Sequence, residues 1–446
     1  MKKINAVLIL AMVALTLAGP TWITNVAGAA EENTSSTANG KEEPADFDAC
    51  ARLALRQSPF LSRTSLEIEI RRLDERDSRS DLLPTFVFQT SYYPVKPSGA
   101  NADPLNYALS WNSQTYNPVV AYFTLKAKEI ITHIATLYHH KAISEGLQRL
   151  AQGFLELETL KRLATTQKEL LALAQKNLAY NQERLKLGEK TPLEVQIANQ
   201  ELEVAQAEKE RLDSEQARVQ DFMRAFIGLK PGQDLTFNLN QAANQILGSY
   251  DPTAADWGQT KTHSIEYKIK NLQKELQSWN ITLSKMKLMP NFFVGVQTPD
   301  PLNVSHVRGI FFSLGLTWTI PVLGGDKKFR DISRQKTILN QFNTDVEASG
   351  IEQKDKWQAG KDKLRQFAAA IKTAQTQEEL ARLKERQSDI LYQAGGEPYS
   401  TLLEARKIYL NAQMNTIQKT AEYSLAKIYL RHLSGDLVYR YVDERF

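Results

Sequence analysis

The sequence predicts a mainly α-helical protein with transmembrane β-strands, built from two copies of one unit. Three observations lead to this fold class: an internal duplication, two very long helical runs that each end in a glycine turn, and four segments in which apolar and polar residues alternate. Each copy is expected to supply one long antiparallel helical hairpin and two strands. A chain of 446 residues is long enough for one such elongated pair.

The composition excludes several classes of protein. Charged residues make up 24% of the chain and hydrophobic residues 42%, which fits neither a disordered polar chain nor a bundle of membrane helices. The formal net charge of +4 is spread without a basic block, so the sequence offers no obvious footprint for nucleic acid. The single cysteine, Cys50, cannot form an intrachain disulfide and is expected to be a small buried residue on a helix.

The first 30 residues have the three-part pattern of a secretory signal peptide. Lys2 and Lys3 precede an apolar run, and the small residues 27–30 precede a polar segment, which predicts cleavage near Ala29 or Ala30. A retained membrane anchor is the alternative. Residues 31–45 are polar and are expected to form a disordered tail.

The duplication is visible in two separate landmarks. The stretch LKLGEKTPLEVQIANQELEVAQ returns as LYQAGGEPYSTLLEARKIYLNAQ, which aligns Gly188 with Gly395 at an offset of 207 residues. The stretch LLPTF aligns with LMPNF at an offset of 206, with Pro84 against Pro290. Because distant landmarks keep nearly the same offset, the chain is an internal repeat. We assign residues 46–228 to the first repeat and residues 262–434 to the second.

Each repeat should begin with a helix of roughly 25–35 residues that ends at the proline, followed by two strands. The strands are expected at about 84–93 and 105–114, and at about 290–298 and 309–321. A long helical run without internal proline follows, from about Val119 to Leu187 and from about Lys327 to Ala394. Each run would make a rod on the order of 100 Å. Its narrow apolar stripe predicts coiled-coil packing against neighbouring helices.

Each long run ends in a glycine turn that predicts the tip of an antiparallel helical hairpin. Gly188 can adopt the left-handed conformation that ends a helix. Thr191 can cap the next helix, Pro192 suits its first position, and Glu194 lies where a capping box has its acidic residue. The corresponding turn residues of the second repeat are Gly395, Gly396 and Pro398.

The strand segments alternate apolar residues with small or polar ones, which is typical of transmembrane β-strands. The clearest example is GIFFSLGLTWTIPV. The residues assigned to a lipid-facing strand surface are Phe86, Phe88, Trp111, Phe312, Leu314, Leu316 and Trp318. The alternative is a sheet packed on the helices of a soluble protein. Four strands cannot close a barrel and open edges are not tolerated in lipid, so a barrel would have to be shared by more than one chain.

In this order, and present twice, these features resemble the TolC family of outer-membrane efflux proteins (outer membrane factors). The stretches that carry the resemblance are LLPTF and LMPNF, TWTIPVLGG, and the two glycine tips. The resemblance implies a homotrimer with a shared 12-stranded β-barrel in the outer membrane of a Gram-negative-type cell. It also implies an α-barrel of the helical hairpins that extends into the periplasm. Residues 229–261 would then form an equatorial linker and residues 435–446 a C-terminal equatorial tail.

The resemblance implies a passive exit duct and no enzyme. Such a duct is the outer-membrane channel of a tripartite efflux or type I secretion system, opened by a periplasmic adaptor (membrane fusion protein) and an inner-membrane pump. The family's pore-constriction positions correspond to Glu194, Tyr392, Thr401 and Glu404. The family has an acidic residue at the position of Thr401, so this chain differs there. The adaptor-docking tips correspond to Leu187, Gly188, Thr191, Ala394, Gly395 and Pro398.

Simpler roles for these residues stay open. Glu194 can be a helix cap, Glu404 a solvated residue and Tyr392 an interhelical contact. The sequence contains no catalytic constellation and no cofactor motif. No metal site is expected either, because His133 and His140 lie seven positions apart on one helix without a third ligand. The alternative functions are a periplasmic coiled-coil adaptor and a structural scaffold protein.

Overall fold

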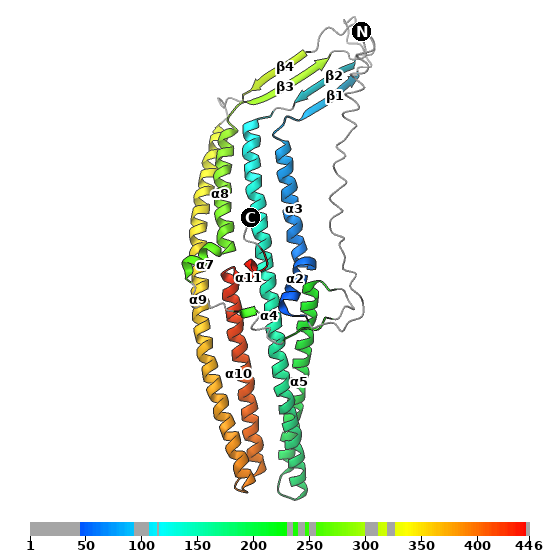
Figure 1. The fold of residues 1–446 in the computed structure, drawn as a ribbon, viewed down its shortest axis with the longest axis vertical. Coiled ribbons are helices and arrows are strands. Elements are labelled where there is room, and N and C mark those ends of the chain that lie inside the picture. Colours follow the sequence, from blue (N-terminus) through cyan, green and yellow to red (C-terminus); the bar gives the residue numbers. More distant parts are fainter. Residues whose placement is uncertain are drawn as a thin grey trace. The chain divides into compact units, whose positions relative to one another are not determined.

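The computed structural model describes residues 45–92, 107–113, 116–229, 235–239, 246–248, 256–298, 311–318 and 326–442. These residues belong to one compact unit, which spans residues 44–446. Helices make up most of the described chain, together with a four-stranded sheet (Figure 1). The predicted signal peptide, residues 1–30, lies outside the described residues.

The two repeats contain the same elements in the same order. The first repeat has α2 (Phe47–Gln57), α3 (Pro59–Ser80), β1 (Phe86–Tyr92), β2 (Tyr107–Ser113), α4 (Pro118–Lys186) and α5 (Pro192–Ile227). The second has α7 (Trp257–His263), α8 (Ile265–Met286), β3 (Asn291–Thr298), β4 (Phe311–Thr317), α9 (Asp326–Gln393) and α10 (Tyr399–Leu433), followed by α11 (Asp436–Tyr439). All four strands fall inside the ranges predicted from the alternating pattern.

The helix expected before each proline is interrupted, which corrects the prediction of one continuous helix. α2 and α3 meet at Ser58, whose backbone is extended with φ −64° and ψ 123°. Ser264 separates α7 from α8 in the second repeat with nearly the same angles, −61° and 118°. Pro59 explains the first break, because a proline disfavours the helical conformation of the preceding residue. At the second break, Ser264 Oγ accepts from the backbone N–H of Tyr267 and so caps α8.

Glycines at the ends of α5 and α10 contact these two breaks. Gly228 has φ 87°, and a Cβ at this position would lie 2.5 Å from the Gln57 carbonyl oxygen. Gly435 has φ 75°, and its Cβ would lie 2.9 Å from the carbonyl oxygen of His263. The carbonyls are 206 residues apart in the sequence and the glycines 207, as in the sequence landmarks. The duplication is therefore preserved in a specific backbone contact.

The segment between the repeats is not only a linker. Ala45, placed in the disordered tail by the sequence, forms a parallel bridge with Phe237, and its N–H donates to the Thr236 carbonyl at 2.8 Å. α7 begins at Trp257, inside the expected linker of residues 229–261. The chain after α10 also contacts the first repeat, because Arg440 pairs with Asp48 at 3.1 Å.

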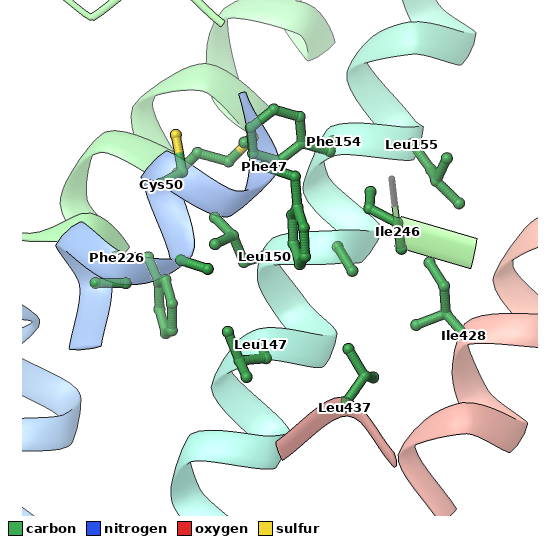
Figure 2. Packing of buried hydrophobic residues seen from close by; sticks show 14 of the residues in the cluster. Phe47, Cys50, Leu147, Leu150, Phe154, Leu155, Phe226, Ile246, Ile428 and Leu437 are labelled. Atoms are coloured by element: carbon green, nitrogen blue, oxygen red, sulfur yellow. The ribbon is translucent and has the colours of Figure 1, made fainter. Parts of the chain in front are cut away.

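A hydrophobic core joins both repeats around the middle of α4 (Figure 2). Leu150 and Phe154 of α4 are fully buried, and the rings of Phe154 and Phe47 meet edge to face at 5.7 Å. α10 and α11 of the second repeat contribute Ile428 and Leu437 to the same core. Cys50 is buried in α2 as expected, and this burial raises the pKa of its thiol to about 12. Burial of each large side chain here stabilises the fold by about 1.5–3 kcal/mol.

The sheet is antiparallel, with the strand order β1-β2-β3-β4. Phe88 pairs with Trp111, Trp111 with Val296, and Val296 with Phe312. The next rows pair Leu314 with Val294 and Leu316 with Phe292. Because directly paired residues lie on the same side of a sheet, these predicted lipid-facing residues share one face.

Outside the core, the helices leave apolar side chains exposed in the single chain. Leu66, Ile70 and Leu73 follow one face of α3 and are 58%, 50% and 50% exposed. On α9, Leu380, Leu383 and Ile390 are likewise exposed. Of the helices within the described residues, none combines the length and the hydropathy that crossing a membrane requires.

Candidate functional site

The tip of the first hairpin is built by the local signals that the sequence contains. Gly188 adopts φ 76° after α4, and its N–H donates to the Leu185 carbonyl at 3.0 Å. Leu187 ends the helix with its side chain 64% exposed. Thr191 caps α5, and its hydroxyl and the Glu194 carboxylate form both halves of the predicted capping box. The tip is therefore a hydrogen-bonded turn that presents an apolar side chain.

The carboxylate of Glu194 is held by its own turn. Lys190 Nζ lies 2.6 Å from Glu194 Oε1, and the Thr191 N–H donates to Oε2 at 2.8 Å. Mainly through these two donors, with Lys190 the stronger, the pKa of Glu194 falls to about 2. In the single chain Glu194 is thus a capping residue, while its role in a pore stays a prediction.

The second tip lacks an equivalent side-chain cap. Gly395 adopts φ 73°, and the Gly396 N–H closes the turn on the Leu391 carbonyl at 2.8 Å. Pro398 is the N-cap residue of α10 and makes no side-chain hydrogen bond, so the helix begins at Tyr399. Ala394, Gly395 and Pro398 are exposed. Both tips are exposed, but a capping box stabilises only the first.

Aromatic rings connect the two hairpins near their tips. The ring of Tyr392, a predicted constriction residue, lies 5.2 Å from that of Tyr399 in its own hairpin. Tyr399 in turn contacts Tyr180 of α4 at 5.4 Å, and Arg184 lies over the Tyr180 ring. Tyr399 and Tyr180 were not predicted from the sequence, because neither position carries a local signal for such a contact.

Two cations on α10 make further links to the first hairpin. Arg406 pairs with Glu169 of α4 at 3.2 Å and with Glu385 of α9. Lys407 pairs with Glu201 of α5 at 2.8 Å, and this hydrogen bond raises the pKa of Lys407. These links were also not predicted from the sequence, because many charged residues occur at helical spacing and nothing marks these pairs.

A groove of about 780 Å³ runs between α5 and α10 over α4. Apolar side chains including Ile197, Val204 and Leu403 line it, together with Glu404 and Lys407. Glu404 and Thr401 are both exposed on α10, with Glu404 on the groove wall. The structure therefore places Glu404 beside the cross-hairpin links and Glu194 at the tip.

The remaining residues singled out in the sequence are the predicted lipid-facing strand residues and the two histidines of α4. Phe312, Leu314, Leu316 and Trp318 are 79%, 83%, 63% and 61% exposed. The side chains of Phe86, Phe88 and Trp111 lie outside the described residues. His133 is exposed whereas His140, two helical turns later on the same face of α4, is buried. In the part of the chain that the structure describes, no group of three or more potential metal-ligating side chains is present.

Comparison with known proteins gives a consistent likeness in structure. No protein-family profile and no curated protein matches the sequence. The outer-membrane channel OprN is similar with a TM-score of 0.73 and 13% identity, over 87% of this chain and 89% of that one. The outer membrane protein VceC from Vibrio cholerae gives a TM-score of 0.72 and 15% identity, over 87% and 96%. The Campylobacter jejuni CmeC outer membrane channel gives 0.72 and 13%, over 90% of both chains.

These likenesses cover almost the whole chain on both sides, at sequence identities that establish the fold alone. They agree with the duplicated hairpins, the paired glycine turns and the four-stranded sheet. The protein therefore has the TolC-like fold of outer-membrane channels.

Proposed function

We propose that the protein is an outer-membrane efflux channel, a passive duct through which substrates leave the cell. The observation that carries this proposal is the likeness in fold to outer-membrane channels over nearly the full chain, together with the exposed apolar face of the sheet. A soluble protein rarely exposes a continuous row of large apolar side chains such as Phe312, Leu314 and Leu316. In a bilayer the same row lowers the free energy of insertion.

In this proposal three copies share the sheet and form a 12-stranded β-barrel, while their hairpins form an α-barrel in the periplasm. The exposed apolar stripes of α3 and α9 support assembly, because they would be buried between neighbouring chains. Residues 1–30 would direct export as a signal peptide. Residues 46–228 and 262–434 would be the two repeats, with residues 229–261 and 435–446 at the equator.

A periplasmic adaptor would dock at the hairpin tips, and an inner-membrane pump would supply the substrate. The exposed tip residues are Leu187, Gly188, Thr191, Ala394, Gly395 and Pro398. Glu194, Tyr392, Thr401 and Glu404 would narrow the periplasmic end of the duct. A carboxylate ring at such a constriction favours cations over anions.

Single-channel recording of the purified full-length protein in planar bilayers tests the function. We expect discrete conductance steps, a trimeric mass by native mass spectrometry, and heat-modifiable migration of the protein from outer-membrane fractions. A monomer that extracts with the soluble periplasmic proteins and gives no conductance would exclude the channel. That result would instead favour the adaptor or scaffold function.

A further inference from the structure

The junction of α8, β4 and α9 carries exposed basic and apolar side chains that the duct itself does not require. Trp318 Nε1 donates to the Leu288 carbonyl at 3.1 Å, and Lys328 Nζ donates to the Lys287 carbonyl at 3.4 Å. These two hydrogen bonds bring the end of α8, the residue after β4 and the first turn of α9 together. We define the basic collar as Lys285, Lys287, Met289, Trp318, Lys327 and Lys328.

The collar combines the side chains found where a membrane surface meets water. Lys285, Lys287 and Lys327 are exposed, and Trp318 and Met289 are 61% and 47% exposed. The indole N–H of Trp318 is bonded to the chain while its ring stays accessible, so the ring has a defined position. Tryptophan favours the headgroup level of a bilayer, and lysine can extend its ammonium group toward phosphates.

The collar continues the apolar face of the sheet. Trp318 directly follows β4, two positions after Leu316 and in the same alternation as Phe312 and Leu314. If that face contacts lipid chains, the next residues toward the helices must lie at the headgroup level. Charge complementarity then favours anionic headgroups, since three exposed lysines lie at the end of α8 and the start of α9, which flank this junction.

The first repeat shows that the fold does not require this charge. At an offset of 206, Asp81 corresponds to Lys287, and Arg79 corresponds to Lys285 but pairs with Glu75 at 3.0 Å. At an offset of 207, Val120 corresponds to Lys327. Two of the three exposed lysines, Lys287 and Lys327, thus have no basic counterpart in the first repeat.

We propose that the basic collar binds the headgroups of anionic glycerophospholipids in the leaflet next to the helical part of the protein. This inference rests on the proposed function, because it needs the sheet to lie in a membrane. The lysines bind the phosphates, and Trp318 sets the depth at which the sheet meets the headgroups. One such lipid-binding surface per copy would fix the height of the assembly in the bilayer.

Native mass spectrometry of the full-length protein in detergent tests the proposal by counting retained phosphatidylglycerol and phosphatidylcholine at equal concentrations. The test variant is Lys285→Gln/Lys287→Gln/Lys327→Gln. The control, Lys363→Gln/Lys372→Gln/Lys384→Gln, removes the same charge from exposed positions of α9 away from the junction. We expect the wild type and the control to prefer phosphatidylglycerol. The collar variant should lose this preference, with affinity falling about fivefold per lysine.

Equal phosphatidylglycerol retention by the collar variant and the control would overturn the proposal. Planar-bilayer conductance of the same samples distinguishes a failure of the lipid-binding proposal from a failure of the proposed channel function. A wild type that conducts but shows no lipid preference overturns the collar alone. A wild type that forms no channel overturns the channel function, and the collar with it.

A depth measurement gives a second, independent test. The contribution of Trp318 to the fluorescence is the difference between the wild type and Trp318→Phe. Lipids brominated near the headgroup should quench this contribution more strongly than lipids brominated near the chain ends. Stronger quenching by the deep bromines, or equal quenching by both, would contradict a headgroup position for Trp318.

Discussion

At the residue scale, Glu194 shows how local chemistry restricts a side chain that could serve a pore. Its carboxylate accepts hydrogen bonds from Lys190 and from the Thr191 backbone, and both favour the ionised form. The charge that would select cations is therefore also the charge that closes the first turn of α5. Any change at this position alters both properties together.

Acid should loosen the first tip. The pKa of Glu194 is about 2 in the folded chain, compared with an ordinary 4.5. A carboxyl group with a lowered pKa contributes stability that is fully present above its unfolded pKa and is lost as pH falls from about 4.5 toward 2. We expect the protection factors of residues 188–200, corrected for the intrinsic pH dependence of amide exchange, to fall across this window. Glu194→Gln should show no such step, and an equal step in both proteins would contradict the assignment.

Glu404 has the accessibility that a pore residue needs, because it lies exposed on the groove wall of α10. In the proposed trimer Glu404→Ala removes three negative charges from the constriction. Single-channel recordings should then show a higher conductance and a weaker preference for cations. Glu379→Ala, which removes an exposed carboxylate from α9, is the control. Unchanged conductance and selectivity in Glu404→Ala would place this residue outside the constriction.

At the element scale, the four positive-φ glycines of the helical hairpins allow two costs of substitution to be told apart, the left-handed backbone conformation and a steric clash with a carbonyl. Gly228 and Gly435 contact a backbone carbonyl, whereas a Cβ on Gly188 or Gly395 would meet nothing within 4 Å. Gly188→Ala and Gly395→Ala should cost only the left-handed backbone conformation, about 1 kcal/mol each. Gly228→Ala and Gly435→Ala add a steric clash and should cost about 1–3 kcal/mol. Thermal unfolding in detergent measures the difference, and equal losses at all four positions would contradict the contact.

The links between the hairpins should control their separation rather than their folding. Arg406 and Lys407 are each about 40% exposed, and such ion pairs contribute only about 0–1 kcal/mol. In Arg406→Ala/Lys407→Ala, spin labels on cysteines introduced at Asn199 and Ile408 should report a longer and broader distance between α5 and α10. The natural Cys50 is buried and should stay unlabelled.

Arg211→Ala is the matched control, because Arg211 forms ion pairs with Glu208 and Glu215, which both lie on its own helix α5. It should leave the distance distribution unchanged. The same broadening in both variants would mean that loss of charge, not loss of the cross-hairpin links, separates the helices.

At the scale of the whole molecule, the exposed face of the sheet would contact lipid in the proposed channel, so it can be tested by its effect on assembly in a membrane. Leu316→Lys places a charge on that face and should cost about 2–4 kcal/mol near the bilayer midplane. We expect the yield of trimer in membrane fractions to fall strongly. Thr317→Lys changes the adjacent residue, which points to the opposite side of the strand, and should assemble. Normal trimer yield from Leu316→Lys would reverse the assignment of the two faces.

Features that depend on neighbouring residues could be predicted without the structure. The alternating pattern predicts the four strands, the left-handed glycines predict both hairpin tips, and Thr191 with Glu194 predicts the capping box. Each of these signals acts over only a few residues, so each can be recognised without a fold. The fixed offset then extended the prediction from one repeat to the other.

Which of these elements contact one another could not be predicted and is known from the three-dimensional fold. Ser264 interrupts a helix without a following proline, Tyr399 contacts Tyr180, and Lys407 pairs with Glu201 from 206 positions away. His140 is buried while His133, two helical turns earlier, is exposed. Helical periodicity states which residues share a face, but not which neighbour covers that face at a given height. That depends on how the helices are rotated and shifted along one another, and it is set by packing across the whole chain.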